Sequence, residues 1–398
     1  MTRSESRYGA YLDTRDREGL RRDLVPVEAR DARTIYIGRE AYLNLASNDY
    51  LALRFHPALI ERARQWAEEH GVGSGASRLV CGNLGCFTAL EAKVAALKQK
   101  PAALIMASGF QANAAVLQAL LDRSVLGAEP LVFSDRFNHA SMHFGCAASG
   151  VREIRYRHGD AAHLGELLKQ YQDYRRPKFI LTESVFSMDG DVAPLPDIGR
   201  LARENGAMLV VDDAHATGIL GEGGRGLSGE ADLVIGTFSK ALGGFGAYVA
   251  CSATLRNYLV NRCSGLIYST ALPPPVLGAI DAALDLLTSL DAERTHVADL
   301  AERFRLGARA LSFDTGASTT QIVPLVAGTN HAALSLSKKL AEAGFFATAI
   351  RPPTVPAGTA RLRLAFTAAH TEADIDALLN ALEDRALTEH ALLRGAAL

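Results

Sequence analysis

The sequence has little excess of either charge. Its 42 Lys and Arg residues face 44 Asp and Glu, which gives a formal net charge of −2 over 398 residues. A protein that binds nucleic acid through the phosphates normally carries a basic surplus, so we expect no nucleic-acid partner. The longest apolar stretches are about a dozen residues or fewer, short of the roughly 20 that a helix needs to cross a bilayer, so no membrane span is expected.

Cysteine is also scarce. The chain has five cysteines, and no two of them form a Cys-x-x-Cys pair, which predicts free thiols in a reducing compartment. The N-terminal segment lacks the apolar core of a secretory signal, and acidic residues are mixed with its arginines, which argues against a transit peptide. These observations predict a cytoplasmic protein, and the length suggests two or three domains with ample core.

The middle of the chain, from about residue 100 to 250, alternates short apolar runs with helical stretches. The runs are Ala103–Met106, Leu131–Ser134, Phe179–Thr182, Met208–Val211, Leu233–Gly236 and Ala247–Cys251. The helical stretches are Ala112–Leu121, His163–Gln172 and Asp197–Glu204. Strands that are apolar throughout are buried on both faces, and their alternation with helices predicts an α/β fold with a large, mainly parallel sheet.

The two ends of the chain differ from this middle. Residues up to about Glu40 are polar and poorly periodic, and His56–His70 is typical of a helix. After the proline-rich linker Ala271–Val276, we expect one long helix at about Leu277–Ala310. Further elements are expected at Gln321–Val326, Ala332–Ala343, Phe346–Ile350, Ala360–Phe366 and Glu372–Ala386, the last with a Thr371–Asp374 capping box. We therefore predict an N-terminal arm (1–45), a large domain (46–280) and a smaller C-terminal α+β domain (281–398).

Lys240 lies in the most informative segment, Gly236–Gly246, just after a buried strand. A lysine at a strand end is often only solvent-facing. Here, however, Thr237 and Ser239 can bind a phosphate, and the glycines allow a ligand to approach the backbone closely. A partly desolvated lysine in this position is a candidate for a Schiff base with a carbonyl compound.

Asp212 and His215 follow the apolar run Met208–Val211, at a strand end where α/β folds place ligands. The carboxylate could cap a helix instead, and a metal site is a third interpretation, but no third ligand is obvious and we expect no metal. A buried carboxylate needs a partner, and the protonated ring nitrogen of a pyridine cofactor would supply one.

Two further strand ends carry polar motifs. Ser108 and Gly109 begin a helix, where unpaired N–H groups can bind a phosphate. His139 follows the next predicted strand, although a single histidine is more often an ordinary surface or core residue. A phosphate site, a lysine, a carboxylate and two histidines at the strand ends of one sheet are the groups that pyridoxal 5′-phosphate (PLP) requires.

On these motifs the sequence resembles the α-oxoamine synthases, a branch of the fold-type I PLP enzymes with the aspartate aminotransferase fold. The resemblance covers about nine-tenths of the chain, starting at Leu45–Leu51. Within the family, Arg351–Arg363, Thr182–Asp191 and Tyr268–Pro274 are similar to the enzymes that join L-alanine to a pimeloyl thioester, with loss of CO₂, in biotin biosynthesis. A homodimer with shared active sites is implied.

The resemblance also implies a role for each matching residue. Lys240 would form the Schiff base and move protons, Asp212 would pair with the ring nitrogen, and His139 would stack on the ring. His215 and Ser187 would lie at the ring oxygen, with Glu183 close by. The phosphate would be surrounded by Ser108, Gly109, Phe110 and Thr237, and Thr270 would reach the phosphate of the neighbouring subunit. Asn48 and Arg363 would receive the amino-acid carboxylate. Arg21 or Arg22 is our candidate for the far carboxylate of the acyl chain.

Alternative activities stay open. Another α-oxoamine synthase with a different amino acid or acyl donor, such as those that make 3-ketosphinganine or 2-amino-3-ketobutyrate, would keep every motif above. Phe87 stands where many members have a histidine, near the expected acyl-substrate entrance, which weakens the assignment of the acyl chain. An aminotransferase-like enzyme or a cofactor-binding remnant is the third hypothesis, although the intact Lys240, Asp212, His215 and Arg363 argue against a remnant. The sequence does not distinguish CoA from an acyl carrier protein as the thioester carrier.

Overall fold

The computed structural model describes residues 3–172 and 175–395, and the chain forms two compact units. The sheet unit comprises Asp49–Ser187 and Asp191–Thr295, and the terminal unit comprises Met1–Asn48, Met188–Gly190 and His296–Leu398. The sequence predicted boundaries at 45/46 and 280/281 and a separate N-terminal arm. Residues 1–48 instead share a unit with the C-terminal segment, because strand β3 (Glu40–Asn44) pairs in parallel with β12 (Phe345–Phe346).

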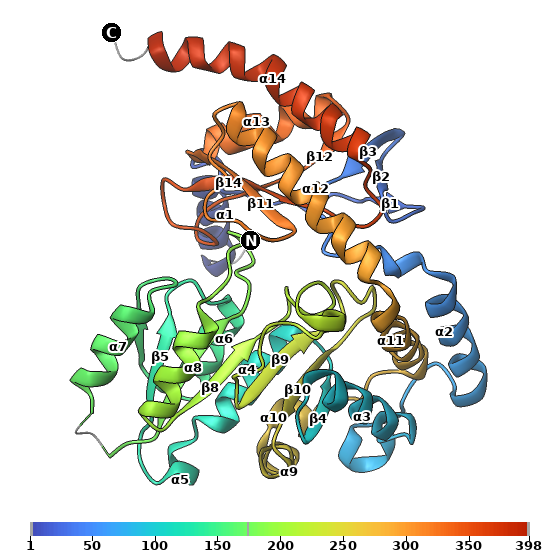
Figure 1. The fold of residues 1–398 in the computed structure, drawn as a ribbon, viewed down its shortest axis with the longest axis vertical. Coiled ribbons are helices and arrows are strands. Elements are labelled where there is room, and N and C mark those ends of the chain that lie inside the picture. The colour runs from blue at the N-terminus through green and yellow to red at the C-terminus, as the bar shows by residue number, and fades with distance from the viewer. Residues whose placement is uncertain (1–2, 173–174, 396–398) are drawn as a thin grey trace. The chain divides into compact units, whose positions relative to one another are not determined.

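A seven-stranded sheet forms the centre of the sheet unit (Figure 1). In spatial order its strands are β4 (Ala102–Met106), β10 (Ala247–Cys251), β9 (Leu233–Thr237), β8 (Ala207–Asp212), β7 (Lys178–Glu183), β5 (Leu131–Asp135) and β6 (Glu153–Tyr156). Only β10 runs antiparallel to its neighbours. The predicted α/β fold with a mainly parallel sheet is confirmed, and all six apolar runs are strands.

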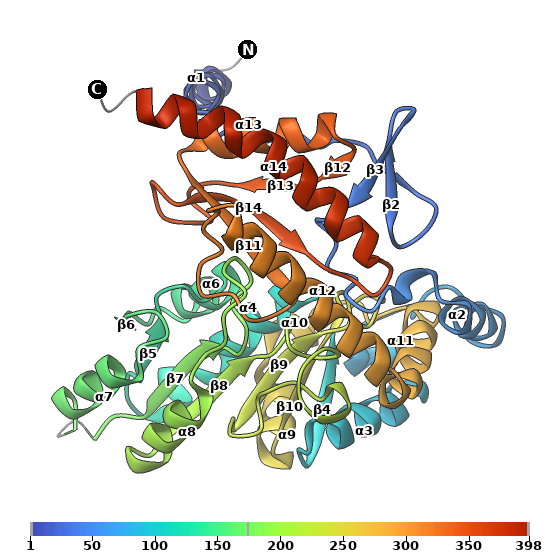
Figure 2. The same cartoon turned by 45° about the horizontal axis from the view of Figure 1, so that its top comes forward.

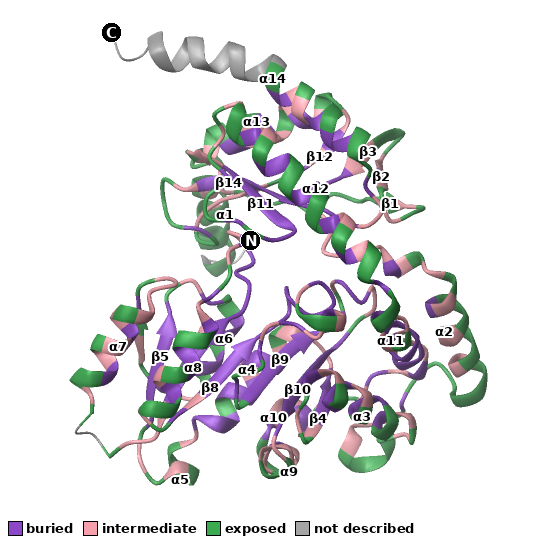
Figure 3. Cartoon of the chain, in the orientation of Figure 1, coloured by how far each residue is buried: buried purple, intermediate pink, exposed green. Residues whose placement is uncertain are grey.

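Helices cover this sheet and bury its strands, which Figure 3 shows in purple. They are α2 (Pro57–His70), α3 (Cys86–Lys98), α4 (Gly109–Leu120), α5 (Arg123–Leu126), α6 (Ala140–Ala148), α7 (Ala161–Gln170), α8 (Leu195–Glu204), α9 (Ala253–Arg262), α10 (Ser264–Ile267) and α11 (Pro274–Leu286). The main apolar core joins α4, α6 and α9 to the sheet through Val116, Leu117, Met142, Val249 and Leu259. This packing fixes the N-termini of α4 and α6 beside the strand ends.

The terminal unit contains two smaller sheets. One has the order β1 (Glu28–Ala29), β2 (Thr34–Ile37), β3, β12, and the other has β11 (Ile322–Gly328), β14 (Ala360–Ala365), β13 (Thr348–Ile350). Helix α13 (Asn330–Glu342) packs on the second sheet (Figure 2). The unit also holds α1 (Arg3–Arg17), most of α12 (Asp291–Ala310) and α14 (Glu372–Gly395).

The cap of α14 forms as predicted, whereas the expected long helix does not. The backbone N–H of Thr371 donates to Asp374 at 2.8 Å, and the Asp374 N–H donates to Thr371 Oγ1 at 3.2 Å, which is a reciprocal capping box. The expected helix 277–310 is interrupted after α11 by a 3₁₀ turn, Leu287–Ser289. There the Ser289 hydroxyl donates to the Leu286 carbonyl at 2.7 Å, a local bond that competes with helix continuation.

Membrane-spanning helices and clusters of metal ligands both bear on function. Within the described residues, no helix combines the length and apolarity that crossing a membrane requires. Over the same part of the chain, no group of three or more His, Cys, Asp or Glu side chains is placed to hold a metal ion.

Candidate active site

Lys240 lies in a tight loop that joins the antiparallel strands β9 and β10 in the sheet unit. The loop is closed by its own polar groups: Thr237 Oγ1 donates to the Gly246 carbonyl at 2.7 Å, and the Gly243 N–H donates to the Lys240 carbonyl at 2.9 Å. Gly243 has a φ of +64°, and a Cβ there would lie 2.5 Å from the backbone N of Arg54. The sequence thus uses glycine to fix the turn that carries a half-buried lysine.

Asp212 is the last residue of β8, and its buried carboxylate accepts two hydrogen bonds. One comes from the Ala214 N–H at 3.0 Å, and the other comes from Asn113 Nδ2 on α4 at 2.6 Å. Donors of this kind stabilise the ionised carboxylate. Asp212 can therefore stay anionic in a site where a cationic ring nitrogen would pair with it.

Glu183 ends the adjacent strand β7 and lies opposite Asp212 in the sheet register. Burial raises its pKa well above the ordinary value, and the charge of Asp212 raises it further, while Lys240 and the backbone N–H of His139 lower it. Its Oε1 atom is buried and has no hydrogen-bond partner among the described residues. The four groups are thus close enough to influence one another.

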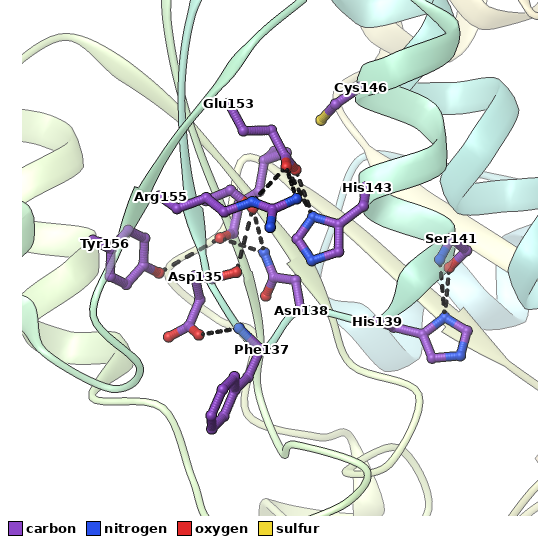
Figure 4. A network of polar contacts seen from close by, with 12 residues as sticks. Asp135, Phe137, Asn138, His139, Ser141, His143, Cys146, Glu153, Arg155 and Tyr156 are labelled. Atoms are coloured by element: carbon purple, nitrogen blue, oxygen red, sulfur yellow. Dashed lines mark hydrogen bonds and ion pairs between the residues drawn. The ribbon is translucent and has the colours of Figure 1, made fainter. Parts of the chain in front are cut away.

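His139 caps the N-terminus of α6, with Nδ1 2.7 Å from Ser141 Oγ (Figure 4). Part of the residue is exposed, but the imidazole is partly desolvated by the protein around it. This desolvation lowers the pKa of His139, and the charges of Lys240 and His143 lower it further against the opposing charge of Asp212. An imidazole beside a carboxylate and a lysine is suited to stacking on an aromatic cofactor.

His215 receives support from a residue that sequence reasoning missed. Its Nδ1 atom lies 2.7 Å from the Tyr50 hydroxyl, and both side chains are buried. Tyr50 falls within the motif Leu45–Leu51, but a partner 165 residues away leaves no local signal in the sequence. The tyrosine fixes the orientation of the imidazole.

The N-terminus of α4 lies where the phosphate site is predicted. Ser108 caps the helix by accepting from the Gln111 N–H at 3.2 Å, and a Cβ on Gly109 would lie 3.8 Å from Thr237 Cβ. The helix start therefore lies beside Thr237, and N–H groups at a helix start can bind an anion. Phe110, by contrast, is half exposed and contacts Phe144 with ring centroids 5.5 Å apart.

The structure also places three further residues that the sequence singled out: Ser187, Thr270 and Phe87. Ser187 is buried in the sheet unit, and Thr270 is exposed and lines a pocket with Arg78, Phe87 and others. Phe87 is fully buried beneath the Arg78 guanidinium, 4.1 Å from the ring centroid.

Asn48, Arg363 and Arg21 belong to the terminal unit, so the sheet unit by itself does not bring them to Lys240. Arg363 lies on β14 and is buried, which excludes the alternative of an exposed strand arginine. Arg21 is half exposed and pairs with Asp16 at 3.8 Å and Asp23 at 3.7 Å. Their roles toward the substrate stay predictions.

The residues at these strand ends fit PLP. A buried carboxylate with N–H donors, a half-buried lysine, an imidazole and a capped helix N-terminus match the ring nitrogen, the aldehyde, the ring face and the phosphate in turn. The buried Glu183 Oε1, which has no partner among the described residues, gives the site a further polar group.

Comparisons with known proteins agree with this geometry. Residues 40–382 match the family model of aminotransferase class I and II. The 8-amino-7-oxononanoate synthase of Gluconacetobacter diazotrophicus is 55% identical over 397 residues, 98% of this chain and 100% of the relative. A protein named putative 8-amino-7-oxononanoate synthase from Paramagnetospirillum magneticum is 54% identical over 378 residues, 94% and 96% of the two chains.

Solved structures show the same fold. A Sphingomonas wittichii serine palmitoyltransferase has a TM-score of 0.87 at 26% identity and covers 95% of this chain and 95% of its own. The 8-amino-7-oxononanoate synthase from Francisella tularensis has a TM-score of 0.74 at 26% identity, with 88% of this chain and 99% of its own covered.

Proposed function

Because the chain belongs to the aminotransferase class I and II family, as one of its α-oxoamine synthases, we propose that it is a PLP-dependent 8-amino-7-oxononanoate synthase. It would condense L-alanine with a pimeloyl thioester, release CO₂ and the carrier thiol, and so serve biotin biosynthesis. The observation that carries the proposal is the full-length identity of 55% to a relative of that name. The grouping of Lys240, Asp212 and His139 supports it.

The cofactor would be held by groups already placed around the strand ends. Lys240 would bind its aldehyde carbon, Asp212 its ring nitrogen and His139 its ring face. The phosphate would be bound by Ser108, Gly109, Phe110 and Thr237, and the ring oxygen by His215 and Ser187. When bound, PLP supplies an electron sink for the negative charge that develops at the substrate's Cα atom.

The chain's own groups handle the protons and the charge. The Lys240 amine is the base that takes the proton from the alanine Cα atom and later returns one to the product. Asp212 accepts two N–H donors, which orient its carboxylate toward the place of the ring nitrogen. Tyr50 keeps His215 in one orientation, so this histidine presents a fixed nitrogen to the ring oxygen.

Three residues of the terminal unit are candidates for substrate binding. Asn48 and Arg363 would receive the alanine carboxylate, and the burial of Arg363 supports a role other than solvation. Arg21, which is half exposed, would meet the far carboxylate of the pimeloyl chain.

A homodimer and a cytoplasmic location complete the proposal. Phe110 and Phe144 are 50% and 56% exposed and contact each other, and an exposed apolar pair of this kind could be covered by a second copy. By the family resemblance, Thr270 would contribute its hydroxyl to the phosphate site of that second copy. The five unpaired cysteines agree with a reducing compartment.

Measuring thiol release over a panel of substrates tests the activity. The enzyme should release CoA from pimeloyl-CoA only when L-alanine is present, with glycine and serine as control amino acids and palmitoyl-CoA as control acyl donor. A tenfold preference for palmitoyl-CoA with serine, about 1.4 kcal/mol of transition-state free energy, would overturn the biotin assignment. Conversion of PLP to the pyridoxamine form by an amino acid alone would indicate an aminotransferase instead.

A further inference from the structure

A chain of hydrogen bonds connects Asp212 to His139 through two residues that carry no assigned role. Asn113 Nδ2 donates to Asp212 Oδ2 at 2.6 Å and to Ser141 Oγ at 3.0 Å. Ser141 Oγ lies 2.7 Å from His139 Nδ1, the contact drawn in Figure 4. Asn113, Ser141 and Asp212 are buried, and the four residues come from β8, α4 and the start of α6.

The ionised carboxylate fixes the direction of the hydrogen bonds that Asn113 makes. An ionised carboxylate only accepts, so the Asn113 amide must present its NH₂ group to Asp212, and its second hydrogen serves Ser141. The reversed amide would place Asn113 Oδ1 2.6 Å from a carboxylate oxygen, a repulsive contact. Because Ser141 Oγ accepts from Asn113, its own hydrogen is available for His139 Nδ1.

The backbone adds a second donor at the same nitrogen. The Ser141 N–H also points at His139 Nδ1, at 3.4 Å. Two donors facing Nδ1 require an unprotonated, accepting nitrogen, so the ring hydrogen must be on Nε2. A cationic ring would place an N–H at Nδ1 against these donors, in agreement with the lowered pKa of His139.

We propose that Asn113 and Ser141 are positioning residues that hold His139 as the neutral tautomer with its hydrogen on Nε2 and tie that tautomer to the ionised state of Asp212. The catalytic consequence of this inference rests on the proposed function. The tautomer of His139 depends only on the hydrogen bonds within this protein. The ring that stacks on the cofactor and the carboxylate that pairs with the cofactor's nitrogen are thereby set by one network. Protonation of Asp212 would remove the acceptor that orients Asn113 and so weaken the hold on His139.

The tautomer is measured directly by ¹⁵N NMR of the full-length protein with labelled histidine, with and without PLP. The His139 signals, assigned by their loss in His139→Gln, should show the hydrogen on Nε2 between about pH 6 and 8. In Ser141→Ala we expect a mixture of the two neutral tautomers. Ser141→Thr, which keeps the hydroxyl, should restore the single tautomer.

Two further variants complete the design. Asn113→Leu removes the bridge at similar volume and should also give mixed tautomers, whereas Ser149→Ala, which removes a hydroxyl at the other end of α6, should change nothing. Ser141→Ala should lower kcat about fivefold, the usual effect of one lost hydrogen bond, with a smaller change in the alanine KM. An Nδ1–H or cationic ring in the unmodified protein, or unchanged spectra in both Ser141→Ala and Asn113→Leu, would refute the proposal. A wrong substrate assignment would alter the thiol-release panel and leave the tautomer as it is.

Discussion

Replacing His158 by glutamine should destabilise the protein, and the loss should depend on pH. His158 Nδ1 lies 3.1 Å from Asp135 Oδ1, and Nε2 lies 2.9 Å from Asp191 Oδ2. Burial by itself lowers the pKa of His158, but the hydrogen bonds and charges of the two carboxylates outweigh it and raise the pKa to about 10. The side chain is thus a cation that joins the end of β5 to the segment after β7.

The size of the effect follows from this pKa. A rise from 6.5 to about 10, at 1.36 kcal/mol per pH unit, corresponds to about 5 kcal/mol. The side chains of His158 and Asp191 are partly exposed, and solvent screens such pairs, so we expect a contribution of about 2–3 kcal/mol. Asp135 keeps the N–H groups of Phe137 and Gly159 as donors, which also limits the cost of losing the imidazolium.

The raised pKa of His158 determines how its contribution to stability changes with pH. Because the folded-state pKa lies above the unfolded value, the contribution is fully present below about pH 6.5 and is lost as the pH rises through about 10. Urea unfolding at fixed protein concentration should therefore show a difference of about 2–3 kcal/mol between the parent and His158→Gln at about pH 6, shrinking by about pH 10.

His70→Gln is the matched control, since that histidine is half exposed at the end of α2. It should change the free energy of unfolding by less than about 0.5 kcal/mol at every pH. A loss for His158→Gln that stays constant with pH, or grows toward pH 10, would refute the reasoning.

Three other substitutions test the site. Lys240→Ala should abolish thiol release, and borohydride reduction of the parent enzyme followed by peptide mapping should label Lys240; a label on another lysine would contradict the assignment. Tyr50→Phe should lower kcat about fivefold, because one hydrogen bond to His215 is lost, and an unchanged kcat would show that the bond does not matter. Glu183→Gln should keep kcat within about twofold, because the raised pKa of Glu183 favours the neutral carboxyl, which the amide mimics; a tenfold loss in steady-state assays would show that an ionised Glu183 is required.

The sequence predicted the sheet well where strands are apolar throughout and poorly where they are not. Strand β6 was missed because Glu153 and Arg155 interrupt its apolar pattern at the sheet edge, where burial on both faces is not needed. Helix α1 was missed for a related reason, since its mostly exposed surface produces no apolar stripe. The break between α11 and α12 depends on a local Ser289 bond that periodicity cannot reveal.

For the site, the sequence predicted the candidate reacting groups but few of the residues that orient them. Lys240, Asp212 and His139 were predicted because each follows a strand, and parallel strands bring such ends together. Asn113 and Ser141 follow Ser108 and His139 closely in the sequence, yet their roles depend on contacts between helices and strands. The Asn113–Asp212 bond joins positions 99 residues apart, and the Tyr50–His215 bond joins positions 165 apart.

The structure also resolves a question of charge that the sequence leaves open. Glu183 and Asp212 end neighbouring strands in register, and either could pair with a cationic ring nitrogen. Ionising two adjacent buried carboxylates costs free energy because their charges repel, so one of the two favours its protonated form. Asp212 accepts from Asn113 and Ala214, whereas Glu183 Oε1 has no hydrogen-bond partner among the described residues. The two hydrogen bonds therefore favour Asp212 over Glu183 as the carboxylate that would pair with the cofactor's cationic nitrogen.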